Sequence, residues 1–176
     1  MPEIIYYVAA SLDGYIATAD GGVEWLDELE STGEDYGYTE FYESVDGLLM
    51  GSRTYEQCLT FGDWPYPEKQ SWVFTQRPIE SSRPDIFVTN QKPKKLVNEL
   101  EARKLEKLWL VGGAEIAESF RTEGLINEHI VSIIPVILGS GIPLFASGGQ
   151  KETLKLAGHT AYKSGIVQVR YVPVQS

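Results

Sequence analysis

Cysteine and histidine are scarce in this sequence, which contains one Cys and two His among 176 residues. A single thiol excludes an internal disulfide and a multi-cysteine metal site, and we expect Cys58 to lie in the core. His129 and His159 are far apart in the chain, so the sequence predicts no metal site. The HxE and PCxxC signatures of zinc deaminases are also absent.

Basic residues are few as well. Lys and Arg total 15 against 25 Asp and Glu, which gives a formal net charge of −10. A protein that binds nucleic acid needs a basic surface, so this balance argues against nucleic acid as a partner. An anionic small molecule would have to be held by a few local basic side chains and by backbone amides.

Signal-peptide and membrane-spanning patterns are missing too. The chain begins Met-Pro-Glu and passes directly into a strand-like run, so we expect a cytoplasmic protein. One long stretch, residues 130–150, is uncharged, but it contains Pro135, Pro143 and four glycines, which a spanning helix tolerates poorly. We expect a buried strand followed by a loop, and no contact with a membrane.

Apolar runs and helical patterns alternate along the first two-thirds of the chain, and strands dominate afterwards. This pattern predicts one α/β domain over residues 1–176, with a mostly parallel central sheet, an antiparallel C-terminal edge and helices on both faces. The expected strands are residues 4–10, 47–51, 71–75, 85–89, 107–111, 126–138, 154–156 and 166–172. The expected helices are residues 34–45, 52–59, 92–104 and 114–120.

Three expected strand ends lead into short turns rich in glycine, hydroxyl or arginine side chains. Carboxyl ends of parallel strands lie along one edge of a sheet, where open α/β sheets bind ligands. Helix N-termini there present free N–H groups, and Gly112 and Gly113 would let a phosphate approach the backbone. Arg53 and Arg77 would suit a 2′-phosphate, because a guanidinium grips it bidentately. The turns are residues 50–54 (Met-Gly-Ser-Arg-Thr), 74–77 (Phe-Thr-Gln-Arg) and 111–115 (Val-Gly-Gly-Ala-Glu).

Each of these features has a purely structural alternative. Glycines often end buried strands for packing reasons, and Arg53 could form a surface ion pair with Glu56. The GxGxxG fingerprint with its following acidic residue is absent, so the sequence does not predict a standard NAD site.

Five segments in order carry a family resemblance. They are residues 11–17 (Ser-Leu-Asp-Gly-Tyr-Ile-Ala), 49–56 (Leu-Met-Gly-Ser-Arg-Thr-Tyr-Glu), 73–77 (Val-Phe-Thr-Gln-Arg), 110–116 (Leu-Val-Gly-Gly-Ala-Glu-Ile) and 135–145 (Pro-Val-Ile-Leu-Gly-Ser-Gly-Ile-Pro-Leu-Phe). With them the chain resembles the dihydrofolate reductase superfamily. It is most similar to the reductase domain of the bifunctional riboflavin-biosynthesis deaminase-reductase.

The resemblance implies a reductase that binds NADPH in an extended pose. Residues 51–54 and 75–77 would hold the adenosine and its 2′-phosphate, residues 112–116 the pyrophosphate, and Ala10 and Ile16 would flank the nicotinamide. The Gly112–Gly113 bond would be cis, and the loop 11–30 would be a lid. The implied cofactor-binding residues are Ala10, Ile16, Gly51, Ser52, Arg53, Thr54, Thr75, Arg77, Val111, Gly112, Gly113, Ala114, Glu115 and Ile116.

The family also implies an acidic residue on the first helix, a fixed distance before the Met-Gly strand end. That spacing identifies Asp35 as the candidate catalytic acid that orients the substrate and controls its proton. Tyr36 and Thr39 would lie on the same side of the helix 34–45, and Val8 would complete the substrate site. The alternative is that Asp35 only complements the helix dipole. Asp13 is a rival acid that ordinary Asp-Gly turn chemistry explains better.

The substrate stays open among a pterin, a ribosylaminopyrimidine and another flat heterocycle, because residues 22–27 match the substrate motif of riboflavin-pathway reductases only loosely. We expect an NADPH-dependent reductase. The alternatives are a non-catalytic NADPH sensor of the same fold, and an α/β domain whose glycine turns are only structural. We also predict a homodimer, by analogy with the family and because the apolar segment 130–145 could supply a hydrophobic face.

Overall fold

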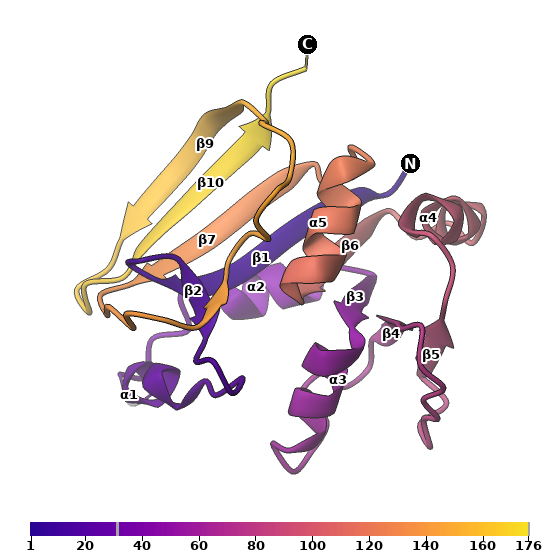
Figure 1. Cartoon of the computed structure of the whole chain (residues 1–176), viewed down its shortest axis with the longest axis horizontal. Helices are drawn as coiled ribbons and strands as arrows, with labels where there is room; N and C mark the ends of the chain where they lie inside the picture. Colours follow the sequence, from indigo (N-terminus) through magenta and orange to yellow (C-terminus); the bar gives the residue numbers. More distant parts are fainter. Residues whose placement is uncertain (31, 176) are drawn as a thin grey trace.

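The computed structural model describes residues 1–30 and 32–175, and an eight-stranded sheet runs through it (Figure 1). The strand order is β5-β4-β3-β6-β1-β7-β10-β9. The strands from β5 to β7 in this order run parallel, whereas β10 is antiparallel to both β7 and β9. The predicted parallel sheet with an antiparallel C-terminal edge is therefore confirmed. The bounds are β1 Glu3–Ser11, β3 Gly47–Gly51, β4 Gln70–Phe74, β5 Ile86–Thr89, β6 Lys107–Gly112, β7 Glu128–Ile134, β9 Leu154–Ala161 and β10 Val167–Pro173.

Helices cover both faces of this sheet, as predicted. One face packs around Trp109 and Met50, under α2 and α3. The other packs around Leu110 and Phe120, under α4 and α5, and Figure 1 shows α5 and α2 on opposite sides of the sheet. Strands buried from both sides become continuous apolar runs, which is why the sequence marks them clearly. The helices are α2 Tyr38–Ser44, α3 Ser52–Leu59, α4 Pro93–Ala102 and α5 Ala114–Thr122.

A second, two-stranded sheet joins the loop after β1 to the segment after β7. In it, β2 (Tyr15–Ala17) pairs antiparallel with β8 (Ile142–Pro143). The carboxylate of Asp13 accepts hydrogen bonds from the backbone N–H groups of Leu138 (3.1 Å) and Gly139 (2.8 Å), and from the Ser11 hydroxyl. Asp13 thus holds its own turn through Ser11 and links that turn to the segment after β7, a contact that Asp-Gly turn chemistry does not predict.

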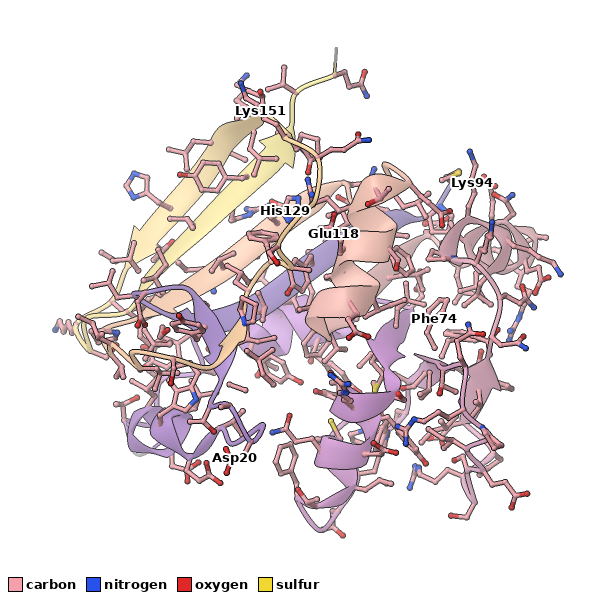
Figure 2. All side chains as sticks on the ribbon, in the orientation of Figure 1. Asp20, Phe74, Lys94, Glu118, His129 and Lys151 are labelled. Carbon is pink, nitrogen blue, oxygen red and sulfur yellow. The ribbon has the colours of Figure 1, made fainter. Side chains whose placement is uncertain are left out.

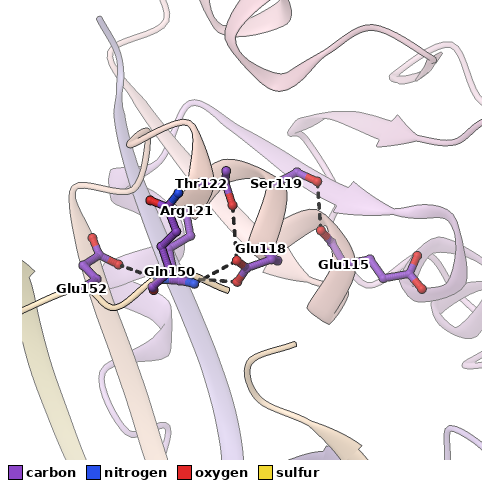
Figure 3. A network of polar contacts seen from close by, with 7 residues as sticks. All are labelled: Glu115, Glu118, Ser119, Arg121, Thr122, Gln150 and Glu152. Carbon is purple, nitrogen blue, oxygen red and sulfur yellow. Dashed lines mark hydrogen bonds and ion pairs between the residues drawn. The ribbon is translucent and has the colours of Figure 1, made fainter. Parts of the chain in front are cut away.

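The segment after β8 is fixed to α5 by a polar network around Arg121 (Figure 3). The Arg121 guanidinium donates to both carboxylate oxygens of Glu118 and to the backbone carbonyl of Gln150, and it also pairs with Glu152. Residues 135–152 therefore form a strap across the α5 face of the sheet, held by Asp13 near one end and by Arg121 near the other.

The uncharged stretch 130–150 consists of a buried strand followed by this strap, as expected. Its first part lies in β7 between β1 and β10, where Ile130, Val131 and Ile134 are buried. These side chains belong to the core, so the apolar side chains of the expected face 130–145 that stay exposed come from its later part, and they include Ile137 and Phe145. The homodimer itself stays a prediction. In the described chain, no helix is long and apolar enough to cross a membrane.

The helix expected over residues 34–45 is shorter than predicted. It begins only at Tyr38, because Tyr36 (φ 56°) and Gly37 (φ 79°) both have left-handed backbone conformations, which a right-handed helix excludes. Asp35 lies in the turn before the helix. The pattern of apolar residues misses this break, since Tyr36 is not a residue that ordinarily marks a left-handed position.

His129 of β7 is buried on the α5 face, between the rings of Tyr6 and Phe145. Neither of its ring nitrogens has a hydrogen-bond partner among the described residues. Burial, with a smaller contribution from the charge of Arg121, lowers the pKa of His129 from 6.5 to about 4. The imidazole is therefore neutral at pH 7.

This lowered pKa predicts how stability depends on pH. The unfolded chain binds a proton at His129 near pH 6.5 and the folded protein only near pH 4, so the free energy of unfolding falls as pH falls through this window. We expect His129→Phe to remove up to about 3 kcal/mol of that loss. Urea unfolding of both proteins between about pH 7 and pH 4 measures the difference. An identical pH dependence would show that His129 is not the responsible group.

Candidate functional site

A cleft of about 1530 Å³ lies along the edge of the sheet where the parallel strands end. One wall consists of the turns that follow β3, β4, β5 and β6, together with the first turns of α3 and α5. The opposite wall consists of β2, the following loop 19–24, β8 and residues 146–147 of the strap. The cleft volume is well above that of a single drug-sized ligand pocket and suits an extended ligand.

Most of the implied cofactor residues meet in this cleft. Those that line it are Ile16, Gly51, Ser52, Arg53, Thr54, Thr75, Arg77, Gly113, Ala114, Glu115 and Ile116. Ala10, Val111 and Gly112 are not among the residues that line it. Ala10 is buried within β1, so its side chain contributes to the core beneath the cleft. Segments that are far apart in the sequence thus meet at the strand ends.

The floor of the cleft is kept open by glycine. A Cβ atom on Gly113 would stand 3.2 Å from Cγ2 of Ile116, and one on Gly51 would stand 3.6 Å from the same atom. No side chain of the described residues caps the first turn of α5. Its backbone N–H groups therefore point toward this space, as a bound phosphate would require.

The predicted cis bond between Gly112 and Gly113 is wrong, because the described residues contain no cis peptide bond. The two glycines instead have φ angles of 152° and 100°, values that only glycine adopts readily. These angles turn the chain from β6 into α5 with trans peptide bonds.

The two arginines of the cleft are both held by glutamates. Nη2 of Arg77 lies 2.9 Å and 3.1 Å from the carboxylate oxygens of Glu56 on α3. Arg53 forms a looser pair with Glu115, at 3.8 Å, and both side chains are largely exposed. The ion pair that the sequence suggested as an alternative, Arg53 with Glu56, does not form, since Glu56 is paired with Arg77.

One part of the cleft was missed by our sequence analysis. It is the turn of residues 89–93 between β5 and α4, which is a fourth strand end of the kind already considered. The loop 19–24, whose tip carries Asp20 (Figure 2), lies within the segment 11–30 that the family resemblance implies as a lid, and it lines the cleft. The Gln57 side-chain amide of α3 donates to the Gly21 carbonyl, so this loop touches the opposite wall across the cleft. Nothing in the local sequence predicts that long-range contact.

The residues implied for the substrate are not brought together. Val8 packs into the core on the α5 face of the sheet, whereas Asp35, Tyr36 and Thr39 lie at the start of α2 on the other face. Asp35 and Thr39 are exposed. The Asp35 carboxylate accepts from the backbone N–H of Gly37 (3.0 Å) and of Thr39 (3.3 Å), and these bonds lower its pKa. Asp35 is therefore a helix-capping carboxylate that stays ionised at neutral pH.

Tyr36 connects this region to the C-terminal strands. Its ring packs edge-on against Tyr162, with centroids 4.9 Å apart. Beside it, the side-chain amide of Gln168 donates to the hydroxyls of Tyr7 and Ser132, both at 3.1 Å. Tyr7, Ser132, Gln168 and Tyr162 lie on β1, β7, β10 and the tip of the β9–β10 hairpin. All four are neutral polar residues, and because they come from distant segments, their spacing in the sequence did not suggest this cluster.

The parallel sheet and its edge cleft define an α/β domain of the kind that binds an extended ligand at its strand ends. Residues 2–168 match the RibD C-terminal domain, and the chain belongs to this family of reductase domains related to riboflavin biosynthesis. The predicted family is thereby confirmed.

Several known proteins are similar over nearly the whole chain. The Bacillus subtilis protein YwjB, itself uncharacterised, is 38% identical over 171 residues, which cover 97% of each chain. A crystal structure of a candidate riboflavin biosynthesis protein from Shewanella sp. PV-4 has a TM-score of 0.87, with 29% identity, and covers 99% of this chain and 100% of that one. The fold also matches a diaminohydroxyphosphoribosylaminopyrimidine deaminase/5-amino-6-(5-phosphoribosylamino)uracil reductase from Thermotoga maritima (TM-score 0.74, 16% identity), over 98% of this chain and 57% of that one.

Proposed function

We propose that the protein is an NADPH-dependent reductase that transfers a hydride to a flat heterocyclic substrate. The observation that carries this proposal is the cleft, in which glycine turns, a helix N-terminus and two arginines line one wall. This arrangement suits a ligand with several phosphates, and family membership supports a reductase. NADPH, when bound, would supply the hydride.

The residues of the chain would bind and position that cofactor. Arg77, Arg53 and Ser52, at the ends of β3 and β4, would hold the 2′-phosphate, and the first turn of α5 would hold the pyrophosphate. Ile16 of β2 would then lie toward the nicotinamide end. The loop 19–24, which touches Gln57, would cover the cofactor and exclude water from the reacting atoms.

The experiment that tests this proposal is turnover with a labelled cofactor. Purified protein is mixed with NADPH deuterated at C4 and with dihydropterin and aminopyrimidine carbonyl or imine compounds, and the products are analysed by mass spectrometry. We expect NADPH oxidation with transfer of one deuterium to a product. NADPH binding without transfer to any compound would favour the non-catalytic sensor, and the exposed position of Asp35 is the observation that keeps that alternative in view.

The charge of Glu56 is expected to weaken NADPH binding. A 2′-phosphate must take Arg77 from Glu56, which holds it through both carboxylate oxygens. Glu56→Gln removes the competing charge, so we expect NADPH affinity to rise by roughly threefold to tenfold, with little change for NADH. Fluorescence titration with both cofactors measures this. Equal gains for the two would contradict the placement of the 2′-phosphate at Arg77.

Asp35 remains our candidate for orienting the substrate, now as an anion rather than as a proton source. Its pKa is lowered by the backbone amides of Gly37 and Thr39, so at neutral pH it can accept a hydrogen bond from a substrate N–H but has no proton to donate. We expect Asp35→Asn to raise KM roughly tenfold and to change kcat little. Asp46→Asn, another carboxylate that caps backbone amides, is the matched control. A collapse of kcat at constant KM would instead assign Asp35 to proton transfer.

A further inference from the structure

Acidic and basic side chains are segregated along this chain. Residues 1–52 contain no Lys, Arg or His, although they contain nearly half of the 25 acidic residues. All 15 Lys and Arg follow, and the first of them is Arg53. In the fold, this division places every base of the cleft on one of its two walls.

The two walls of the cleft differ in charge as a result. The wall formed by the strand-end turns carries all the bases of the cleft, Arg53, Arg77 and Lys92. It also carries three acids, Glu56, Glu115 and Glu123, two of which are paired with the arginines, so its formal charges balance. Among the described residues, the opposite wall, formed by residues 16–24, 141–143 and 146–147, contains two acids, Asp20 and Glu24, and no base. Figure 2 shows Asp20 at the tip of the loop that borders the cleft.

Three exposed carboxylates of residues 1–52 stay ionised. A hydrogen bond from Ser11 holds the pKa of Asp13 below its usual value, and one from Thr18 does the same for Asp20. The backbone amide of Gly37 lowers the pKa of Asp35, which lies before α2 and does not line the cleft. All three are exposed, so they contribute a negative potential at neutral pH that salt will partly screen.

Apart from the carboxylate of Glu34, the side chains around Asp35 are neutral. They are the hydroxyls of Tyr36 and Tyr162 and, beside them, the Tyr7–Ser132–Gln168 network. Lys163 is a base in this region, exposed at the tip of the β9–β10 hairpin next to Tyr162, and it forms no ion pair with another described residue.

From this distribution we infer that the substrate of this protein is an uncharged or cationic heterocycle without a phosphate or carboxylate group. The inference rests on the proposed function, because it takes the nicotinamide end of the cofactor to face the acidic wall. It separates this chain from the Thermotoga maritima relative, whose name specifies a phosphoribosyl substrate. The bases of the cleft would bind the phosphates of the cofactor. The substrate would then lie against the acidic wall.

The size of the effect follows from Coulomb's law. A phosphate dianion about 10 Å from three or four exposed carboxylates, with a Debye length of about 8 Å, loses roughly threefold to fivefold in affinity relative to a neutral group, and more at lower salt. Because the repulsion is screened by salt, this penalty should shrink as ionic strength rises.

The test uses two matched pairs of compounds with the NADPH-loaded protein. One pair is 5-amino-6-ribosylaminouracil with and without a 5′-phosphate, and the other is dihydrobiopterin and dihydrofolate, which share a ring but differ in charge. Binding to the NADPH complex and kcat/KM are measured at low and high salt. We expect the neutral member of a pair to be favoured by roughly tenfold at low salt, and by less at high salt.

Charge variants locate the effect. Glu24→Lys should reduce the preference for the neutral compound by severalfold, whereas Glu106→Lys, which makes the same charge change before β6 at the opposite end of the sheet, should leave it unchanged. A preference for the phosphorylated compound that disappears in Lys163→Ala would overturn the inference, as would failure of all four compounds to bind. Failure of NADPH itself to bind would instead overturn the proposed function.

Discussion

Replacing Arg77 with alanine is expected to weaken NADPH binding roughly 10- to 100-fold, and NADH binding by less than about threefold. The reason is that only NADPH carries the 2′-phosphate, a dianion that a guanidinium binds through charge-assisted hydrogen bonds. Arg77 follows β4 and reaches Ser52 and Glu56 at the start of α3, so its guanidinium stands where two strand ends meet. Arg53→Ala should act in the same direction but more weakly, since the Arg53 side chain is 83% exposed.

The matched control for these variants is Arg83→Ala. Arg83 is also a partly exposed arginine in an ion pair, with Asp85, but it does not line the cleft. Arg83→Ala removes one positive charge, as Arg77→Ala and Arg53→Ala do. Any general effect of net charge on cofactor binding therefore appears in all three variants. Equal losses of NADPH and NADH affinity in Arg77→Ala would show that the 2′-phosphate binds elsewhere.

A second large effect is expected at Gly141, next to β8. A Cβ atom there would overlap the carbonyl oxygen of Ala17 in β2, and the φ angle of 151° is one that only glycine adopts readily. Gly141→Ala should therefore destabilise the protein by roughly 3 kcal/mol, through backbone strain and steric overlap together. It should also weaken NADPH binding, because β2 and β8 form one wall of the cleft.

Gly139→Ala separates the two causes. Gly139 also has a positive φ angle, 78°, but a Cβ atom on it would meet nothing within 4 Å. We expect Gly139→Ala to lower the free energy of unfolding by only about 1 kcal/mol and to leave cofactor binding intact. Urea unfolding and NADPH titration of both variants test this. Equal destabilisation would mean that the approach of β8 to β2 is not tight in solution.

The parallel sheet could be predicted because its strands are buried on both faces and therefore appear as short apolar runs such as residues 47–51. The cleft could be predicted in outline because strand ends of a parallel sheet share one edge, which brings Gly51, Thr75 and Gly113 together without any knowledge of distances. The break before α2 could not, since it depends on a left-handed tyrosine, Tyr36, stabilised by its surroundings.

Contacts between distant segments could not be predicted from the sequence either. The pairing of β2 with β8, the hold of Glu56 on Arg77 and the placement of Gln168 beside Tyr7 are all made by tertiary packing. Nothing local in the sequence marks them. The positions of Val8 and Asp35 on different faces of the sheet could not be predicted for a related reason: alternation along β1 points Val8 to the α5 face, opposite α2. Their role at the substrate stays a prediction.

The most direct test of the central claim is a comparison of NADPH and NADH binding to the purified wild-type protein by fluorescence titration at moderate salt. An NADPH site with two arginines at the 2′-phosphate predicts saturable binding that is at least about tenfold tighter for NADPH than for NADH. No NADPH binding, or equal affinity for the two, would contradict the account and leave the glycine turns and arginines of the cleft with a structural role alone.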